Sequence, residues 1–125
     1  MRAAVVERYG PPEVVSVRDL PDPVARKGQV VVRVRATTVN SGDARIRGCR
    51  FPRGFAVPGR LALGWRGPRR PVLGVVYAGV VESVGPGVIG ISVGDEVAGM
   101  TGVAMGGHAE LAAVRADRLT PVPAG

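Results

Sequence analysis

The clearest alternation of hydrophobic and polar residues lies in segment 29–39. Arg33 and Arg35 separate apolar residues there, and both arginines would share one face of an extended strand. Successive side chains of a strand point to opposite faces, so this pattern predicts a half-buried antiparallel strand with one face in water. The apolar face would contain four residues: Val30, Val32, Val34 and Ala36.

Other apolar segments, separated by Gly and Pro, predict further strands and turns. The interrupted segments read as short strands because few of them carry the period of an amphipathic helix. We expect strands at Arg2–Glu7, from Val14 to Val17, at Leu73–Val84, at Val93–Val97, at His108–Val114 and at Leu119–Pro123.

One short helix and one long loop interrupt the strands. Ser41 could cap one or two helical turns that run through Asp43–Arg47. Residues 48–71 show no clean period and contain four prolines, which predicts a long loop. The fold class is therefore all-β with a minor helical part, arranged as a partly open β-barrel or sandwich.

Length and composition indicate one domain with neither a secretory signal nor a membrane span. Its 125 residues are one domain's worth of protein, and a single cysteine, Cys49, excludes an internal disulfide. The four apolar residues after Arg2 are too few for a secretory signal, and no apolar run approaches a membrane span. We therefore expect a cytoplasmic protein with no membrane partner.

Positive charge is concentrated in the centre of the chain. The net charge is +7, and no acidic residue lies between Asp43 and Glu82. Such a segment attracts phosphates of a cofactor or of nucleic acid, although a solvated basic loop without a partner is the simpler interpretation. The eight arginines of this segment are Arg45, Arg47, Arg50, Arg53, Arg60, Arg66, Arg69 and Arg70.

Seven stretches, in order, resemble the N-terminal domain of medium-chain dehydrogenases and reductases, especially the quinone-oxidoreductase branch. They are Met1–Val6, Gln29–Asp43, Pro71–Gly74, Ala78–Val88, Val93–Val97, Gly106–Glu110 and Ala116–Leu119. The resemblance implies a GroES-like, partly open β-barrel, with residues 1–125 forming the catalytic-side (substrate) domain. In family members a Rossmann domain for NAD(P) follows, and it is absent from this chain.

The resemblance also bears on zinc, which many family members bind. A catalytic zinc needs three protein ligands. In zinc-dependent members a cysteine lies near the helix-opening turn and a His-Glu pair follows a glycine. The matching positions here are Asn40–Asp43 and Gly74-Val75-Val76, which lack those ligands. Cys49 alone cannot form a four-cysteine lobe, so we expect a zinc-independent protein with no metal site.

A glycine pattern of the dinucleotide-binding type occurs at Gly85-Pro86-Gly87-Val88-Ile89-Gly90. The pattern binds a pyrophosphate when a helix opens at its glycines and presents backbone N–H groups. Pro86 removes one such donor, and another turn follows at Ser92–Asp95. We therefore expect a turn between strands and no dinucleotide site here.

Asn40 and Asp43 are the main candidate site residues. The resemblance implies that they line the cleft where the nicotinamide meets the substrate, as catalytic and cofactor-binding residues. The alternative is structural, because Asn suits a strand end and Asp suits a helix start. Both roles are compatible.

Aromatic residues and the single histidine supply further candidates. Phe51, Phe55 and Trp65 could form an apolar wall that binds a planar substrate, or they could anchor the loop. His108 has no orienting partner in the sequence, which favours a structural role over proton transfer. Tyr77, among valines, is expected in the core with a hydrogen-bonded hydroxyl.

Together these inferences predict the substrate-side domain of a zinc-independent, NAD(P)H-dependent oxidoreductase that acts on a quinone, an enone or a related carbonyl. The cofactor, NADP or NAD, would be bound mainly by the missing Rossmann domain, so this chain alone would be inactive. The sequence leaves open whether a homodimer forms. The alternative is a free-standing, non-catalytic binding module whose arginine-rich loop contacts an anion or nucleic acid, although nucleic acid is not the expected partner.

Overall fold

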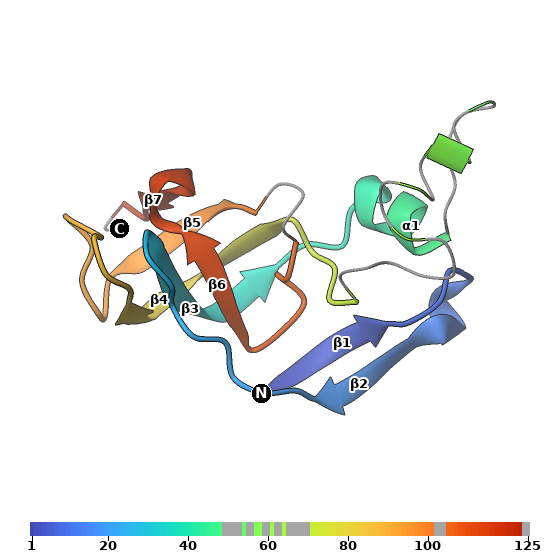
Figure 1. Ribbon diagram of the computed structural model, residues 1–125, viewed down its shortest axis with the longest axis horizontal. Helices are drawn as coiled ribbons and strands as arrows, with labels where there is room; N and C mark the ends of the chain where they lie inside the picture. The colour runs from blue at the N-terminus through green and yellow to red at the C-terminus, as the bar shows by residue number, and fades with distance from the viewer. Residues whose placement is uncertain are drawn as a thin grey trace.

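Two antiparallel sheets make up most of the computed structural model, which describes residues 1–48, 54, 57–58, 61, 64, 71–101 and 105–123. The smaller sheet pairs β1 (Arg2–Val6) with β2 (Val15–Asp19). The larger sheet has the order β6-β3-β4-β5-β7 (Figure 1). Its strands are β3 (Gln29–Thr37), β4 (Val76–Val84), β5 (Glu96–Met100), β6 (Leu111–Arg115) and β7 (Leu119–Pro121).

Helical structure is minor in the described part of the chain. The helix α1 (Ser41–Gly48) follows β3, and 3-10 turns occupy Pro12–Val14 and Ala116–Arg118. None of the helices in these described ranges is long and apolar enough to cross a membrane. The predicted all-β class with one short helix is confirmed.

Strand β3 organises the larger sheet because it pairs with β4 on one side and β6 on the other. Its predicted alternation holds around Val34, which is partly buried between exposed Arg33 and Arg35, but Ala36 is exposed and its predicted place on the buried face was wrong. Val31 differs from the prediction, since it is 2% exposed although it points to the face opposite Val30 and Val32. The start of β3 is therefore buried on both faces.

The main hydrophobic core covers one face of this sheet. Tyr77 and Val81 of β4 are each 1% exposed, and they pack with residues of β3, β5 and β6. Full burial of a valine side chain contributes about 1.5–3 kcal/mol. The buried members of the cluster are Val30, Val32, Tyr77, Val81, Val97, Ala112 and Val114.

The two sheets meet without closing into a complete barrel. Isolated bridges join Ala3 to Ala109 and Val5 to Val72. The Ala4 N–H also donates to the His108 carbonyl oxygen at 2.9 Å. These contacts hold β1 against the segment that precedes β6, and they leave the architecture partly open, as predicted.

Three strands begin three residues later than the sequence predicts, among them β6, which begins at Leu111 rather than His108. β4 begins at Val76 rather than Leu73, and β5 begins at Glu96 rather than Val93. The Ser92 N–H donates to Asp95 Oδ2 at 2.8 Å, which closes a turn before β5. Side-chain-to-backbone bonds of this kind compete with strand pairing, so the predicted strand at Val93–Val97 was placed three residues too early.

Candidate functional site

The corner between β3 and α1 is held by a reciprocal pair of hydrogen bonds. The Asp43 N–H donates to Asn40 Oδ1 at 3.0 Å, and the Asn40 N–H donates to Asp43 Oδ2 at 3.1 Å. The Asn40 carbonyl also accepts the Ala44 N–H at 3.2 Å, the first bond of the helical ladder. This is a capping-box arrangement, so Asn40 caps the helix and the prediction of Ser41 as the cap was wrong.

The carboxylate of Asp43 is the most deeply buried charged group in the described residues. Asp43 is 3% exposed. Its Oδ2 accepts the Asn40 N–H, whereas its Oδ1 has no hydrogen-bond partner. A position in the first turn of α1 favours a negative charge, but an unpartnered buried carboxylate oxygen remains costly. Such an oxygen is a candidate for contact with a ligand donor.

His108 lies beside Asp43 and is fixed by backbone bonds on both sides. Its N–H donates to the Leu73 carbonyl at 2.9 Å, and its carbonyl accepts the Ala4 N–H. In the ring, Nε2 lies 2.9 Å from the Thr38 carbonyl oxygen and 3.7 Å from Asp43 Oδ2. Because a carbonyl oxygen only accepts hydrogen bonds, Nε2 carries a proton and donates a hydrogen bond to the Thr38 carbonyl oxygen.

These partners of His108 could not be predicted from the sequence. Thr38 and Asp43 precede it by about seventy residues, and no local pattern connects them. The side chain of His108 is 15% exposed, so it is neither fully buried nor on the open surface. The structure therefore brings Asp43 together with a residue that sequence reasoning had set aside.

An apolar pocket of about 370 Å³ adjoins this pair. Four polar residues line it, namely Thr37, Asp43, Arg47 and His108, and the Arg47 Nε–H donates to the Gly10 carbonyl at 3.3 Å. The remaining lining is aliphatic, which suits a small apolar ligand with few polar groups. We call it the Asp43 pocket; its other lining residues are Ala4, Val6, Val15, Val39 and Leu73.

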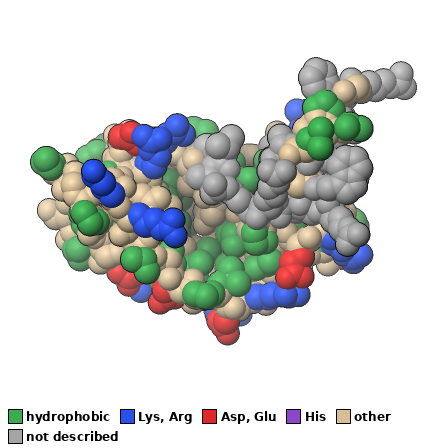
Figure 2. Space-filling view, viewed as in Figure 1, with side chains coloured by type: hydrophobic (Ala, Val, Ile, Leu, Met, Phe, Trp, Pro, Cys, Tyr) green, Lys and Arg blue, Asp and Glu red, His purple; other side chains and the backbone are tan. Residues whose placement is uncertain are grey.

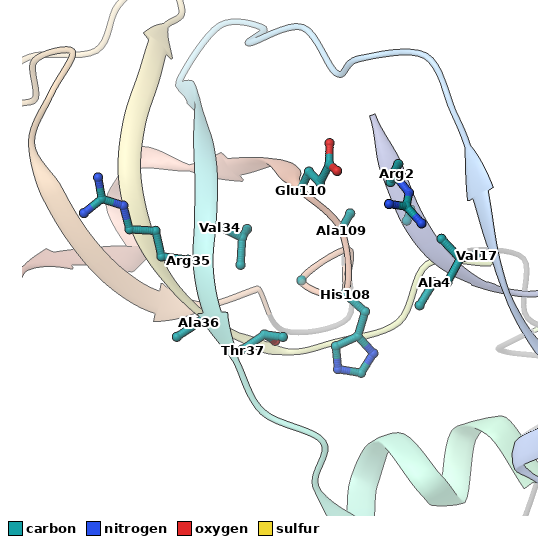
Figure 3. A pocket seen from close by; sticks show the side chains of 12 residues that line it. Arg2, Ala4, Val17, Val34, Arg35, Ala36, Thr37, His108, Ala109 and Glu110 are labelled. Carbon is teal, nitrogen blue, oxygen red and sulfur yellow. The ribbon is translucent and has the colours of Figure 1, made fainter.

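A second cavity, of about 330 Å³, lies on the other side of His108. Ala4, Thr37 and His108 line both cavities, so the imidazole ring stands at their boundary. Figure 3 shows the ring between Thr37 of β3 and Ala4 of β1, with Glu110 farther along the cavity. In the space-filling view, hydrophobic side chains gather near the middle of the displayed face, between groups of charged side chains (Figure 2).

The predicted aromatic wall is not part of the described structure. Phe51, Phe55 and Trp65 lie outside the described residues, as does most of the arginine-rich segment 48–70. Their contribution to a substrate site remains a prediction.

The glycine pattern at Gly85–Gly90 forms a turn, as expected. It joins β4 to the turn that precedes β5, and no helix opens at its glycines. The Gly85 N–H donates to the Gln29 carbonyl at 2.8 Å, so this amide is already occupied. The segment lacks the helix start at which several N–H groups would point toward a pyrophosphate.

Within the described ranges, no group of three or more His, Cys, Asp or Glu side chains is arranged to hold a metal ion. The position that matches the zinc-ligand pair of zinc-dependent relatives is occupied by Val75 and Val76, at the start of β4. Gly74, which precedes them, has a φ of +99°.

Tyr77 is in the core, but its hydroxyl differs from the prediction. The residue is 1% exposed, and its buried Oη has no hydrogen-bond partner. Burial raises the pKa of the Tyr77 hydroxyl to about 12. The hydroxyl is tolerated because the facing residue, Gly99, has no side chain: a Cβ at Gly99 would lie 2.7 Å from Tyr77 Oη.

Comparison with known proteins places this site in a family. Residues 26–124 match the model of the alcohol dehydrogenase GroES-like domain. The chain belongs to this family. This GroES-like domain is 34% identical over 124 residues to the quinone oxidoreductase of Mus musculus, an alignment that covers 98% of the chain and 34% of the mouse protein.

Solved structures show the same relationship. An alcohol dehydrogenase superfamily protein from Novosphingobium aromaticivorans is 37% identical, with a TM-score of 0.76 over 97% of this chain and 34% of that chain. A mycobacterial protein, Rv1454c, solved in complex with NADPH, is 32% identical, with a TM-score of 0.73 over 98% of this chain and 34% of that chain. The 125 residues thus span about a third of the relatives they match.

Proposed function

We propose that this GroES-like domain is the substrate side of a zinc-independent, NADPH-dependent reductase that acts on a quinone, an enone or a related carbonyl. The observation that carries the proposal is the Asn40–Asp43 corner beside the apolar Asp43 pocket. The names of the relatives add support, since quinone oxidoreductase and an NADPH complex occur among them.

Asn40 provides the exposed polar group of this corner. Its Oδ1 is used by the Asp43 N–H, while its side-chain NH2 group has no bond to any described residue. An amide in this position can donate to the carboxamide of a nicotinamide or to a substrate carbonyl. The hydride itself would come from the nicotinamide when it is bound, and Asn40 would hold the reacting groups in register.

Asp43 acts mainly through position in this proposal. Its bond to the Asn40 N–H fixes the backbone from which the Asn40 amide projects. Asp43 lines the pocket, and its buried Oδ1 is an acceptor without a protein partner. A ligand donor that bonded to this oxygen would remove the cost of leaving it unpaired.

The described residues fit the nicotinamide end of the cofactor and not its phosphates. The Asn40 corner offers an amide beside an apolar cavity, whereas the turn at Gly85–Gly90 offers no helix N-terminus. We therefore assign the phosphate contacts to a separate nucleotide-binding domain, like that of the relatives. Zinc is not required in this scheme, since hydride transfer and hydrogen bonding to the carbonyl do not depend on it.

A chimera tests the proposal. Residues 1–125 would replace the matching third of the mycobacterial relative that binds NADPH, and oxidation of NADPH would be followed with 1,4-naphthoquinone. We expect quinone-dependent oxidation by the chimera and none by the isolated 125-residue chain. A folded chimera that binds NADPH but reduces neither a quinone nor an enone would refute the proposal.

A further inference from the structure

His108 lines both the Asp43 pocket and the second cavity, and one of its ring nitrogens has no partner in the described protein. The Nε2 edge of His108 faces Thr38 and Asp43. The Cδ2 edge packs against Gly74, where a Cβ would come within 2.6 Å of it. Nδ1 therefore lies on the remaining edge, and Figure 3 shows a ring nitrogen on the side of Ala4 and Val17. The structure gives Nδ1 no partner among the described residues.

The ring is held in one orientation, so the state of Nδ1 depends on protonation alone. In the neutral ring Nε2 keeps its proton for the Thr38 carbonyl, and Nδ1 is an acceptor. In the protonated ring both nitrogens are donors, and the Asp43 carboxylate, 3.7 Å from Nε2, balances the charge. The pocket thus changes from accepting a hydrogen bond to donating one.

We propose that His108 is the hydrogen-bond partner of a ligand oxygen at the boundary of the Asp43 pocket and the second cavity, beside Ala4, and the proton donor to that oxygen when a carbonyl is reduced. This deepens the proposed function and rests on it for the chemical step. The protonated ring binds the carbonyl, which only accepts, and the neutral ring binds the alcohol or hydroquinone, which donates.

The step balances in atoms and electrons. Hydride transfer from reduced nicotinamide brings one hydrogen and two electrons to a carbon of the carbonyl system, and the carbonyl π pair moves onto the oxygen. The proton on His108 Nδ1 then passes to this oxygen, and the ring becomes neutral. Water returns a proton to Nδ1 before the next turnover. The oxidised nicotinamide and the hydroxyl compound are the products.

Several charged groups surround the ring and act on its charge. From α1, Asp43 and Arg47 line the Asp43 pocket with it. From the other cavity, Arg2 of β1, Arg35 of β3 and Glu110 lie around it, although Arg35 points away from the ring in Figure 3. Glu110 and Arg2 carry opposite charges. The acidic partner that the structure gives His108 is Asp43, whose Oδ2 lies 3.7 Å from Nε2.

A matched pair of probes tests the proposal on the 125-residue chain. Acetophenone is an unreactive carbonyl acceptor, and 1-phenylethanol is its reduced form on the same carbon skeleton. His108 is the only histidine in the chain, so its ring signals in an NMR spectrum need no assignment. Dissociation constants would be measured from these signals at pH 5.5 and pH 8, which bracket the range where histidine changes charge.

We expect acetophenone to bind at least about fivefold more tightly at pH 5.5 than at pH 8, because only the protonated ring donates to it. We expect 1-phenylethanol to show the opposite preference. Binding that is independent of pH, binding that leaves the His108 ring signals unchanged, or the absence of binding by both probes would each overturn the proposal.

Three variants complete the test, with binding of the His108 variants followed on backbone amide signals of the pocket. His108→Phe keeps a ring and should lose the pH dependence for both probes. His108→Gln, whose amide donates and accepts at any pH, should bind both probes without pH dependence, and it serves if the Phe variant fails to fold. Glu110→Gln removes a neighbouring titratable group and should keep the wild-type preference; loss of the preference in this variant would assign the effect to Glu110 instead.

The outcome is independent of the turnover assay. A chimera that reduces quinones while probe binding ignores pH would leave the proposed function standing and remove His108 from it. Probe binding with the expected pH preference, combined with an inactive chimera, would leave a ligand site and remove the reductase.

Discussion

Gly74 and the imidazole of His108 pack so closely that no side chain can be placed between them. A Cβ at Gly74 would lie 2.6 Å from His108 Cδ2 and 2.6 Å from its backbone nitrogen. Gly74 also has a φ of +99°, which L side chains rarely adopt. The orientation of the His108 ring, the candidate proton donor, therefore depends on the absence of a side chain at Gly74.

The substitution Gly74→Ala should lower the free energy of unfolding by about 2–4 kcal/mol, the sum of backbone strain and the displacement of His108. Urea unfolding gives the stability, and the NMR signals of the single histidine report the ring. Gly90→Ala is the matched control, since Gly90 has a φ of +82° with nothing within 4 Å of its Cβ. Equal losses in the two variants would show that contact with His108 is unimportant.

Substitutions at Asn40 can separate its structural role from its functional one. Asn40→Ala removes the cap of α1 and should cost about 0.5–2 kcal/mol of stability, whereas Asn40→Ser keeps a capping oxygen and should cost less than about 0.5 kcal/mol. In the quinone-reducing chimera, both variants should lose activity at least about tenfold, because neither retains the amide donor. Full activity in Asn40→Ser would show that capping is the only role of Asn40.

Tyr77→Phe should be neutral or stabilising near pH 7. The buried Tyr77 hydroxyl has no partner, and an unsatisfied buried polar group costs about 1–3 kcal/mol. Tyr77→Ala, by contrast, leaves a cavity and should cost about 3–5 kcal/mol. Thermal or urea unfolding measures both. A loss of more than about 1 kcal/mol in Tyr77→Phe would mean that the hydroxyl does have a partner in solution.

The same hydroxyl makes stability depend on alkaline pH. Burial raises the pKa of the Tyr77 hydroxyl from its ordinary value of 10.0 to about 12. Above pH 10 the unfolded chain loses this proton first, so the folded state loses stability as pH rises from 10 toward 12, by up to about 1.4 kcal/mol per pH unit. Tyr77→Phe should lack this component, and the difference between the two unfolding curves at pH 9 and pH 11 measures it.

The purified chain should contain no stoichiometric zinc. The positions that hold zinc ligands in zinc-dependent relatives carry Asn40 and two valines, Val75 and Val76. Metal analysis after dialysis should return less than about 0.1 zinc per chain, because a catalytic zinc needs three protein ligands. One zinc per chain would contradict the zinc-independent proposal.

The sequence predicted those parts of the fold that depend on local pattern. The strand at Gln29–Thr37 and the Gly-rich turn after β4 are both local, and both were confirmed, although Val31 and Ala36 depart from the predicted alternation of burial. The start of β5 was predicted too early because β-branched Val93 favours a strand. The Asp95 side chain instead closes a turn at this point. The hydrophobic periodicity of a sequence does not reveal a side-chain-to-backbone hydrogen bond of this kind.

The candidate site depends on contacts that no local pattern contains. Asn40 and Asp43 were identified from the family resemblance at a strand-to-helix corner, and their mutual bonds are observed. The partners of His108 come from the far end of β3 and from α1, so only the folded chain brings them together. The unpartnered hydroxyl of Tyr77 is likewise a property of packing.

The position of β3 at the centre of the larger sheet has a consequence for biosynthesis. One of its neighbours, β6, pairs Arg115 with Gln29, so this edge of β3 stays open until nearly the whole domain has left the ribosome. Contacts of such separation close long loops, and they form more slowly than hairpins. During that interval the apolar residues of β3 lack their β6 partners, and exposed apolar strands of this kind are prone to associate with other chains.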